Sequence, residues 1–414
     1  MDQDSPPSDI DIKRQPLPRN VKLLGAASFL NDIASEIIAP LLPFFLTVTL
    51  GGTKFWLGVI EGAAESISSL LKLYSGALSD RLGRRRELVI FGYSLAAIAR
   101  PLMGFAGTAW HVLAIRLGDR VGKGIRTSPR DALIADSTDP AIRGRAFGFH
   151  RAMDHLGAAI GPVLATVFLL VWPDQLRLLF CFTLFPGVLV VLLLVFGLQE
   201  YRKPKEEKPP AEKETEQPGP PPQDMPLDRN FRVFMFAIIL FTLGNASDAF
   251  LLVRATELGV PIAWLPILWC GFHIVKSLCN LLAGRASDRF GAKRMLVIGW
   301  MAYAASYLSF ALVTSAIWFW LFFFVYGFFY SISEPAEKAM TAALAGRNRQ
   351  GRAFGWFNFS IGIAALPSSL LFGLIYQKFG ALAAFGWGAV LALLAATCLI
   401  GVRQIPKTLP EKRR

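Results

Sequence analysis

Apolar runs of about 20 residues recur along the whole chain, and they constrain its fold more than any other feature. A helix of that length crosses a hydrocarbon layer about 30 Å thick, because each residue advances it by about 1.5 Å. Charged residues make up 18% of the 414 positions, against about a quarter in a soluble domain. The sequence therefore predicts an all-α polytopic membrane protein. We place its twelve transmembrane helices at residues 22–47, 55–79, 87–106, 109–137, 146–171, 177–198, 231–256, 263–284, 294–313, 316–345, 353–377 and 380–402.

The distribution of Lys and Arg among the connecting segments predicts the orientation of these helices. The connections after the second, fourth, eighth and tenth runs are basic and read SDRLGRRR, TDPAIRGRA, SDRFGAKR and AGRNRQGR. The connections on the other side, such as GGTKF and TSAI, are nearly neutral. Because basic connections stay in the cytoplasm, we expect both termini there. This bias accounts for the formal net charge of +13, so we expect no nucleic-acid partner.

One long polar segment divides the chain. Residues 201–230 are rich in Lys, Glu and Pro and bury too little apolar surface to fold, which predicts a cytoplasmic linker. It separates a bundle of six helices at 21–200 from a second bundle at 231–403. Residues 1–20 are polar and proline-rich, and we expect a disordered cytoplasmic tail without a cleavable signal peptide. Residues 404–414 form a basic cytoplasmic tail.

The two halves repeat one another in sequence. GALSDRLGRRR at 76–86 recurs as GRASDRFGAKR at 284–294, and GRAFGFH at 144–150 recurs as GRAFGWF at 351–357. FLNDIASE at 29–36 is echoed by TLGNASDAF at 242–250. Three echoes at nearly the same offset predict a duplicated unit, and hence two pseudo-symmetric six-helix bundles.

The first of these echoes resembles the signature between the second and third helices of the major facilitator superfamily. Twelve spans, a central linker and two repeats extend the resemblance over essentially the whole chain. It implies a secondary transporter of a bacterial inner membrane, in which charges at the cytoplasmic helix ends latch the halves together. The alternative is that these arginines only set topology and contact lipid head groups. The expected gating residues are Gly76, Asp80, Arg81, Gly83, Arg84 and Arg85, with a second copy at Gly284, Asp288 and Arg289.

The stretch LGDRVGKGIRTSPRDALIADS at 117–137 is the most charged part of any apolar run. A phosphate-binding loop would need glycine where Leu117 stands and Ser or Thr where Gly124 stands, so a nucleotide site is disfavoured. At 100° per residue the charged positions from Arg116 to Arg130 fall within an arc of about 140°. Charges on one face of a spanning helix face a bundle interior or a cavity. This run therefore predicts a helix that lines a polar cavity.

In the superfamily the first, fourth, seventh and tenth helices line a central cavity, and here all four carry polar residues. Asp32 and Glu36 lie one helical turn apart, and we expect one of them to exchange protons in competition with substrate. The alternative is permanent pairing with Arg126, Arg130 or Arg151. Arg126 and Arg130, rather than Arg116 and Arg120, are expected to meet a substrate or these carboxylates. The full expected set is Asn31, Asp32, Glu36, Arg126, Arg130, Asp131, Arg151, Asp154, Asn245, Asp248, Tyr330, Glu334, Glu337 and Lys338.

The fifth run contains Gly157, Gly161 and Pro162, which partly match the antiporter motif of the superfamily. The resemblance implies export of substrate in exchange for protons. Two glycines one turn apart also permit a close helix crossing, and a proline bends a helix, so helix packing alone is the alternative.

These patterns predict a transporter rather than an enzyme, because the sequence shows no nucleophile triad, nucleotide loop or dense metal cluster. We expect proton-coupled efflux of a small solute by a monomer whose partners are the solute, protons and the lipid bilayer, without a cofactor or a resident metal. Two alternatives stay open: export of a divalent transition-metal cation, with His150, His155 and His273 beside Asp32 and Glu36 as its ligands, and import of an anionic metabolite. A sensor or scaffold without transport is disfavoured, because charges inside a membrane are costly.

Overall fold

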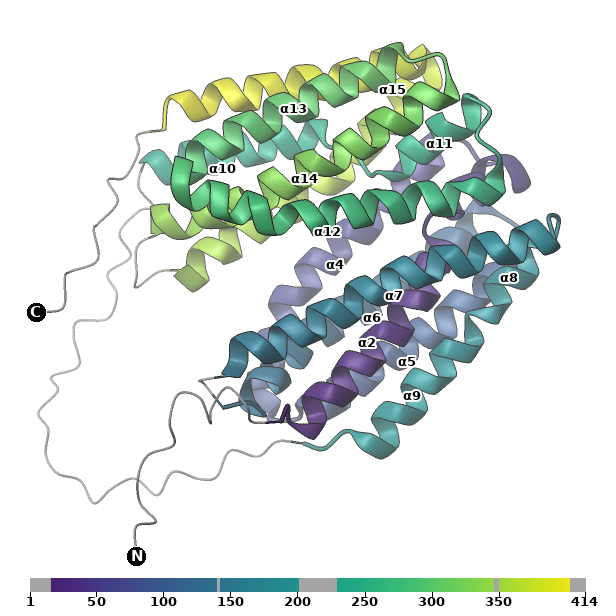
Figure 1. The fold of residues 1–414 in the computed structure, drawn as a ribbon, viewed down its shortest axis with the longest axis vertical. Coiled ribbons are helices and arrows are strands. Elements are labelled where there is room, and N and C mark those ends of the chain that lie inside the picture. Colours follow the sequence, from purple (N-terminus) through teal and green to yellow (C-terminus); the bar gives the residue numbers. More distant parts are fainter. Residues whose placement is uncertain (1–15, 140–141, 201–228, 346–349, 403–414) are drawn as a thin grey trace, which may run out of the picture.

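Helices form all of the regular structure in the residues that the computed structural model describes, which are 16–139, 142–200, 229–345 and 350–402 (Figure 1). The N-terminal half contains α2 (Arg19–Ile38), α3 (Leu42–Phe44), the π-helical turn η1 (Phe45–Thr49), α4 (Lys54–Leu82), α5 (Arg85–Leu102), η2 (Met103–Phe105), α6 (Ala109–Asp136), α7 (Arg143–Val171), α8 (Leu176–Phe182) and α9 (Leu184–Gly197). The C-terminal half contains α10 (Arg229–Gly244), α11 (Ala249–Glu257), η4 (Ile262–Trp264), α12 (Leu265–Phe290), α13 (Ala292–Leu312), α14 (Ala316–Ala345) and α15 (Gln350–Ile400).

Each of the twelve predicted runs falls on one of these helices or on consecutive short ones. The run at 177–198 corresponds to α8 and α9, and the run at 231–256 to α10 and α11. The last two runs share α15, which Gly380 divides with a φ of 80°. A positive φ is accessible to glycine without steric cost, so this residue reverses the chain between two spans.

Eight helical segments of the described chain are long and apolar enough to cross a membrane, with α15 counted once. Helices α4 and α6 fail that test, because each carries charged residues along its length. The described apolar segment at α12 is the shorter Ile262–Lys276. Helices α4, α6 and α12 are nevertheless 29, 28 and 26 residues long and pack inside the bundles. The charged side chains of α4 and α6 that line the cavity, such as Glu61, Arg116 and Arg120, face protein rather than lipid, as expected for costly groups in a bilayer.

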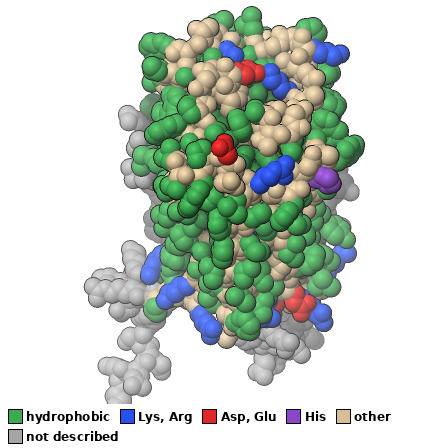
Figure 2. Space-filling view, turned by 90° about the vertical axis from the view of Figure 1, so that its right-hand side faces the viewer, with side chains coloured by type: hydrophobic (Ala, Val, Ile, Leu, Met, Phe, Trp, Pro, Cys, Tyr) green, Lys and Arg blue, Asp and Glu red, His purple; other side chains and the backbone are tan. Residues whose placement is uncertain are grey.

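Large apolar side chains cover the outside of the molecule. Figure 2 shows one face on which hydrophobic side chains predominate. Phe196 and Ile317 are each 80% exposed, and many other large apolar residues are more than half exposed. An apolar surface of this extent is solvated by lipid tails rather than by water. The chain is a multi-pass integral membrane protein.

The two halves form two bundles that lie side by side (Figure 1). In the N-terminal bundle α2 packs on α7 and α9, and α6 packs on α4 and α5. In the C-terminal bundle α15 packs on α10 and α13, and α14 packs on α12 and α13. Two pairs of helices, α4 with α15 and α7 with α12, join the bundles. These pairs occupy equivalent places in the sequence repeat, so the halves meet with approximate two-fold symmetry.

Helices α2 and α10 begin, and α9 and α15 end, at one end of the molecule, which we call the linker end (Figure 1). Here a basic residue caps the last helix of each half. Arg86 donates to the carbonyls of Val195 and Leu198, at 2.7 Å each, and Lys293 donates to Ile400 at 3.0 Å and to Val402 at 2.6 Å. The final carbonyls of a helix lack partners within the helix, and such side chains satisfy them. The two halves, which are similar in sequence, therefore also have similar contacts at this end of the molecule.

The halves differ in what holds their interiors together. The N-terminal half buries charged side chains, among them Arg100, Arg116 and Asp119. The C-terminal half buries aromatic rings instead, and the rings of Phe241 and Trp300 are stacked with centroids 4.6 Å apart. Hydrogen-bonded charges require fixed geometry, whereas rings contribute mainly buried area. The duplicated fold therefore has two chemically different bundles.

Candidate functional site: a polar cavity between the halves

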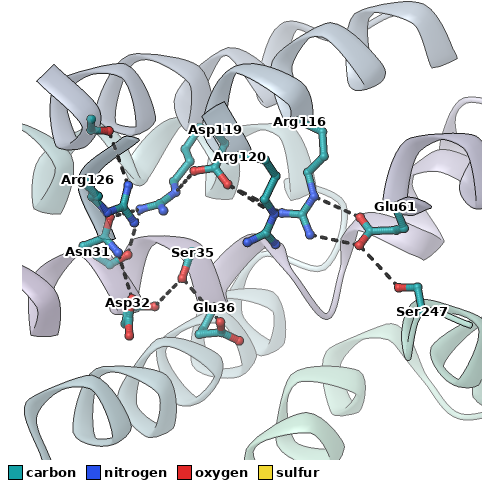
Figure 3. Close-up of polar contacts among 12 residues, drawn as sticks. Asn31, Asp32, Ser35, Glu36, Glu61, Arg116, Asp119, Arg120, Arg126 and Ser247 are labelled. Atoms are coloured by element: carbon teal, nitrogen blue, oxygen red, sulfur yellow. Dashed lines mark hydrogen bonds and ion pairs between the residues drawn. The ribbon is translucent and has the colours of Figure 1, made fainter. Parts of the chain in front are cut away.

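A cavity of about 600 Å³ lies between the two bundles. Its wall comes from α2, α4, α5 and α6 on one side and from α10 to α12, α14 and α15 on the other. Helices α2, α6, α10 and α14 are the first, fourth, seventh and tenth spans, which the sequence predicts to line a cavity. Figure 3 shows the polar side chains of the N-terminal wall.

The predicted site residues divide into two groups. Nine lie on the cavity wall: Asn31, Asp32, Glu36, Arg126, Asn245, Asp248, Tyr330, Glu334 and Glu337. Five lie outside it: Arg130, Asp131, Arg151, Asp154 and Lys338. The second group lies closer to the linker end on α6, α7 and α14, beyond the depth of the cavity. Helical phase places these residues on the correct face but does not give their depth.

Four of these five residues have local partners instead, and Lys338 pairs with Glu334 at 2.9 Å. Arg130 forms an ion pair with the adjacent Asp131, with nitrogen and oxygen 2.8 Å apart. Asp154 lies 3.6 Å from Nδ1 of His150, one turn earlier on α7. Arg130 does not line the cavity in this conformation, and its expected contact with a substrate stays a prediction.

Arg100 of α5 is the centre of a buried hydrogen-bond network, whose members Asn31, Asp32 and Asp119 are labelled in Figure 3. Its Nε donates to Oδ1 of Asp119 at 2.9 Å. One of its terminal nitrogens donates to the backbone carbonyl and the side-chain oxygen of Asn31, at 2.8 and 2.9 Å. The Asn31 amide in turn donates to Oδ1 of Asp32 at 2.8 Å. Arg100 therefore fixes the residue that orients Asp32.

Arg116, rather than Arg126, pairs with a cavity carboxylate. Its Nε and a terminal nitrogen donate to the two oxygens of Glu61 on α4, at 3.0 and 3.2 Å. This bidentate pair is the strong form of an arginine–carboxylate contact. Arg126 lies over the ring of Tyr93, 4.4 Å from its centroid. Arg126 forms no ion pair with a carboxylate in the described chain, and the alternative that it meets a substrate stays a prediction.

Asp32 and Glu36 accept hydrogen bonds from neutral donors. Asp32 accepts from Asn31, and Oε2 of Glu36 accepts from the indole nitrogen of Trp269 on α12 at 2.7 Å. Within the described chain neither carboxylate has a Lys, Arg or His nitrogen within 4.0 Å, whereas Glu61 and Asp119 do. The permanent pairing considered for Asp32 and Glu36 is absent from this part of the structure. Trp269 also makes Glu36 a contact between the halves.

The C-terminal wall presents carboxylates bonded to aromatic donors. Asp248 accepts from the hydroxyls of Tyr326 at 2.7 Å and Tyr330 at 3.5 Å. Glu337 accepts from the indole nitrogen of Trp300 at 3.3 Å. Glu334 alone on this wall is paired with cations, namely Lys276 at 3.5 Å and Lys338 at 2.9 Å.

The seventh span is interrupted where it meets the cavity. Helix α10 ends at Gly244 and α11 begins at Ala249, and the residues between them, Asn245 to Asp248, line the wall. Asn, Ser and Asp compete with helical hydrogen bonds, and the hydroxyl of Ser247 accepts from the backbone nitrogen of Ala249 at 3.3 Å. The same hydroxyl donates to Glu61 of the other half at 3.4 Å. Irregular backbone at membrane depth is tolerated where it lines a cavity.

Gly157 and Gly161 of α7 pack directly behind the two carboxylates of α2. A Cβ atom on Gly157 would lie 2.4 Å from the carbonyl oxygen of Phe29, and one on Gly161 would lie 2.7 Å from that of Ile33. Pro162 is buried in the same helix. The two glycines therefore permit the close crossing that places Asp32 and Glu36 on the wall.

The glycines of the charged stretch have a similar packing role. A Cβ atom on Gly122 would lie 2.5 Å from the carbonyl oxygen of Gly92 on α5, and one on Gly124 would lie 2.6 Å from Cβ of Leu71 on α4. Gly76 of the gating motif is less crowded, since its added Cβ would lie 3.4 Å from that of Ser128. The glycine pattern that first resembles a nucleotide loop thus packs α6 between α4 and α5.

The expected gating motif lies at the linker end. Gly83 ends α4 with a φ of 62°, and Arg81 and Arg84 are exposed. Arg85 forms an ion pair with Asp136, which joins α5 to α6 within the N-terminal half. The side chains of Asp80, Gly284, Asp288 and Arg289 lie outside the described residues.

At the end opposite the linker end, a cluster of side chains joins the halves. Glu257 of α11 contacts Lys54 of α4 at 2.5 Å, accepts from the hydroxyl of Tyr376 at 2.7 Å, and lies 3.5 Å from Arg254. Lys54 also lies over the Tyr376 ring, 4.1 Å from its centroid. No pattern in the sequence indicates this cluster, because its members are far apart in the chain and belong to no repeated motif. We call these four residues the outer cluster.

Comparison with known proteins agrees with this architecture. The family model described as Major Facilitator Superfamily matches residues 24–271 and 255–414. An uncharacterized MFS-type transporter of Methanocaldococcus jannaschii is 32% identical over 394 residues, which are 93% of this chain and 95% of the relative. The multidrug resistance protein MdtH of Yersinia enterocolitica is 23% identical over 337 residues, or 79% of each chain.

A solved structure has the same fold at low sequence identity. It is a bacterial homologue of the human lysosomal transporter Spinster, in an inward-facing and occupied conformation. The likeness has a TM-score of 0.74 at 15% identity and covers 93% of this chain and 98% of the other. The fold and the cavity between two bundles define a membrane transporter of the secondary type. The chain belongs to the Major Facilitator Superfamily.

Proposed function

We propose that the protein exports a small solute in exchange for protons, by alternating access to the cavity between its halves. The observation that carries this proposal is the state of Asp32 and Glu36. Both face the cavity, and both are held by neutral donors rather than by cations. A carboxylate without a cationic partner binds a proton more readily than a paired one. The relative named as a multidrug resistance protein supports efflux as the direction.

Proton uptake at Glu36 would change a contact between the halves. An ionised carboxylate accepts a stronger hydrogen bond than a neutral one, so protonation weakens the bond from Trp269 on α12. Protonation of Asp32 similarly weakens its bond from Asn31. Protonation of these carboxylates changes the charge of the cavity wall and the contact of Glu36 with Trp269, and so competes with binding of the substrate. This competition is the proposed basis of exchange.

The distribution of contacts between the halves fits the inward-facing step of such a cycle, with the linker end in the cytoplasm. The described hydrogen bonds between the halves run from mid-depth, where Ser66 donates to the carbonyl of Gly362, to the outer cluster. On this proposal the solute enters from the cytoplasm, and release requires the outer cluster to separate.

The import of an organic anion is the second candidate, because five Lys and Arg side chains lie on the cavity wall. Export of a divalent metal has less support. No group of three or more His, Cys, Asp and Glu residues in the described chain has the geometry of a metal site.

Proteoliposomes that contain a pH-sensitive dye test the proposal. Addition of a transported solute from a panel of lipophilic cations, organic anions, zwitterions and divalent metals should move protons in the opposite direction. Asp32→Asn and Glu36→Gln should abolish this proton movement, whereas Glu87→Gln, at an exposed carboxylate, should retain it. Transport with unchanged proton dependence in both cavity variants would refute the assignment. Proton-independent uptake of an organic anion would establish the import alternative.

A further inference from the structure

The two walls of the cavity differ in formal charge, because Lys and Arg residues lie on one of them alone. All five Lys and Arg residues on the described wall belong to α5 and α6 of the N-terminal half. The C-terminal half contributes three carboxylates, Asp248, Glu334 and Glu337, and no cation. The N-terminal half also contributes four carboxylates, Asp32, Glu36, Glu61 and Glu65, so a solute between the walls meets cations on one side only and carboxylates on both. Such an arrangement selects a partner with complementary charges at its two ends.

Two of the five cations are available to a ligand. Arg116 is committed to Glu61, Arg100 to Asp119, and Arg126 lies over Tyr93. Within the described chain, the ion-pair contact of Arg120 is with Oδ2 of Asp119 at 4.0 Å. Arg100 already binds the other oxygen of that carboxylate at 2.9 Å.

Lys123 has no hydrogen bond or ion pair within the described chain and lies on the cavity wall one turn from Arg120. Arg120 and Lys72 are the cations in its electrostatic surroundings, and Glu65 and Asp32 are the carboxylates. With Lys123 itself included, three cations stand against two carboxylates in this region. A partly desolvated excess of positive charge binds an anionic group.

The opposite wall supplies negative charge and aromatic surface. Asp248 and Glu337 accept hydrogen bonds only from tyrosine and tryptophan, which leave their charge unneutralised. All aromatic rings on the described wall also belong to this half, namely Phe241, Trp269, Phe329 and Tyr330. Carboxylates beside aromatic faces bind an ammonium group, and the rings pack an apolar body.

We propose that the substrate of the transport function inferred above is a zwitterion with an apolar or aromatic body. Its anionic group binds Arg120 and Lys123, and its ammonium group binds at Asp248. The cavity of about 600 Å³ accommodates a small organic molecule of this kind. A pure anion would leave Asp248 without a partner, and a pure cation would leave Lys123 without one. Each is rejected because an unpaired buried charge is costly.

Binding of matched probes to the purified full-length protein tests this proposal. We would compare 4-(aminomethyl)benzoate and phenylalanylphenylalanine with their methyl esters, which are cations, their N-acetyl forms, which are anions, and the doubly blocked neutral forms. Isothermal calorimetry should show that at least one zwitterion binds about tenfold or more tightly than each of its own derivatives, a factor that corresponds to about 1.4 kcal/mol. Equal or tighter binding of a singly charged form, or no binding of either zwitterion at millimolar concentration, would overturn the proposal.

Two variants locate the ends of the ligand. Lys123→Gln should weaken binding of the zwitterion and leave binding of the cationic ester unchanged. Asp248→Asn should weaken binding of the zwitterion and leave binding of the anionic N-acetyl form unchanged. Lys378→Gln and Asp174→Asn, at exposed positions, are the matched controls. Proton exchange with another solute of the panel, without zwitterion binding, would overturn this inference and leave the proposed function standing. Zwitterion binding without proton movement in proteoliposomes would overturn proton exchange alone.

Discussion

Arg100 shows how a single side chain positions a candidate proton site that it does not touch. Its guanidinium spans from Asp119 of α6 to Asn31 of α2, and Asn31 holds Asp32. The planar fork of arginine suits such a bridge, and lysine has no equivalent geometry. Arg100 is therefore a positioning residue for Asp32.

Arg100→Gln should destabilise the protein strongly. Asp119 would lose its closest cation while it stays 5% exposed, and removal of one partner of a buried pair costs about 3–5 kcal/mol. The midpoint of thermal unfolding of the detergent-solubilised protein measures this loss. Arg84→Gln is the matched control, because that arginine is exposed and 3.6 Å from an exposed Glu87. Equal midpoints for the two variants would show that Arg120 and Arg116 suffice for Asp119.

The milder variant Arg100→Lys separates positioning from stability. Lysine keeps a positive charge near Asp119 but has no planar fork with which to hold Asn31 in the same way. Folding should survive, and proton movement in proteoliposomes should decline. Retention of full proton movement would remove Arg100 from the function of Asp32.

At the residue scale, the sequence predicts which side chains are polar and on which helix face, but not which pairs form. Periodicity places Asp32, Glu36 and the cations of α6 toward a cavity, and the structure places them there except for Arg130. Arg116 pairs with Glu61 because α4 and α6 bring these two residues to the same depth, which periodicity does not give. The sequence does not indicate that Trp269 contacts Glu36, because one tryptophan in an apolar helix is indistinguishable from a packing residue.

Among the elements, α7 crosses α2 closely behind Asp32 and Glu36. Helices approach this closely only where small residues remove side-chain bulk. Gly157 and Gly161 provide the space, and the carbonyl oxygens of Phe29 and Ile33 occupy it. A change in this crossing would move the backbone that carries Asp32 and Glu36.

Gly157→Ala should therefore destabilise the protein and impair transport together. The added Cβ would lie 2.4 Å from the oxygen of Phe29, and such overpacking costs about 1–3 kcal/mol. Gly148→Ala on the same helix is the matched control, because nothing lies within 4 Å of its added Cβ. The control should be neutral or slightly stabilising, since alanine exceeds glycine in helix propensity by about 1 kcal/mol. Similar thermal midpoints for both variants would contradict the packing role.

Most elements of this fold follow from the sequence, because a bilayer demands long apolar helices and basic residues end them. All twelve runs fall on helices of the described chain. The break between α10 and α11 was not predicted. The four residues from Asn245 to Asp248 lie inside an apolar run, and their hydrogen bonds to Ser369 and Glu61 come from distant helices. A local pattern contains no information about those partners.

At the scale of the whole molecule, the outer cluster joins the two halves at the end opposite the linker end. Lys54, Glu257 and Tyr376 come from three helices and both halves, and they join the ends of α4, α11 and α15. Alternating access requires these contacts to form and break in each cycle. In the proposed cycle, the strength of these contacts therefore affects the balance between the inward-facing and outward-facing states.

Glu257→Gln should shift that balance toward closure of the linker end. The pair with Lys54 is partly exposed, and loss of about 1 kcal/mol changes a two-state ratio about fivefold. Spin labels at Leu82 and Trp356, in a chain without its four native cysteines, would report the distance between the halves near the linker end. The variant should gain a population with a shorter distance. Lys378→Gln should match the unchanged sequence, and an identical distance distribution in Glu257→Gln would exclude the cluster as a latch.

The sequence repeat predicted two related bundles but not their divergence in chemistry. The capping residues Arg86 and Lys293 keep equivalent roles, whereas the interiors differ. One interior is built on Arg100 and Asp119 and the other on stacked rings such as those of Tyr303 and Tyr307, with centroids 4.1 Å apart. Aromatic residues are usual in any apolar helix, so their concentration around one wall becomes visible only when the helices are assembled.

The position of Trp269 has a practical consequence. Its indole lies on the cavity wall, bonds Glu36 of the opposite half, and has its ring centroid 5.1 Å from that of His273. Indole emission depends on the charge and polarity around the ring, so the wavelength and intensity of its fluorescence respond to the ionisation of Glu36 and to separation of the halves. The protein therefore carries an intrinsic optical label at the point where protons, substrate and conformation are proposed to meet. Difference spectra between the unchanged chain and Trp269→Phe would isolate its signal from the other nine tryptophans.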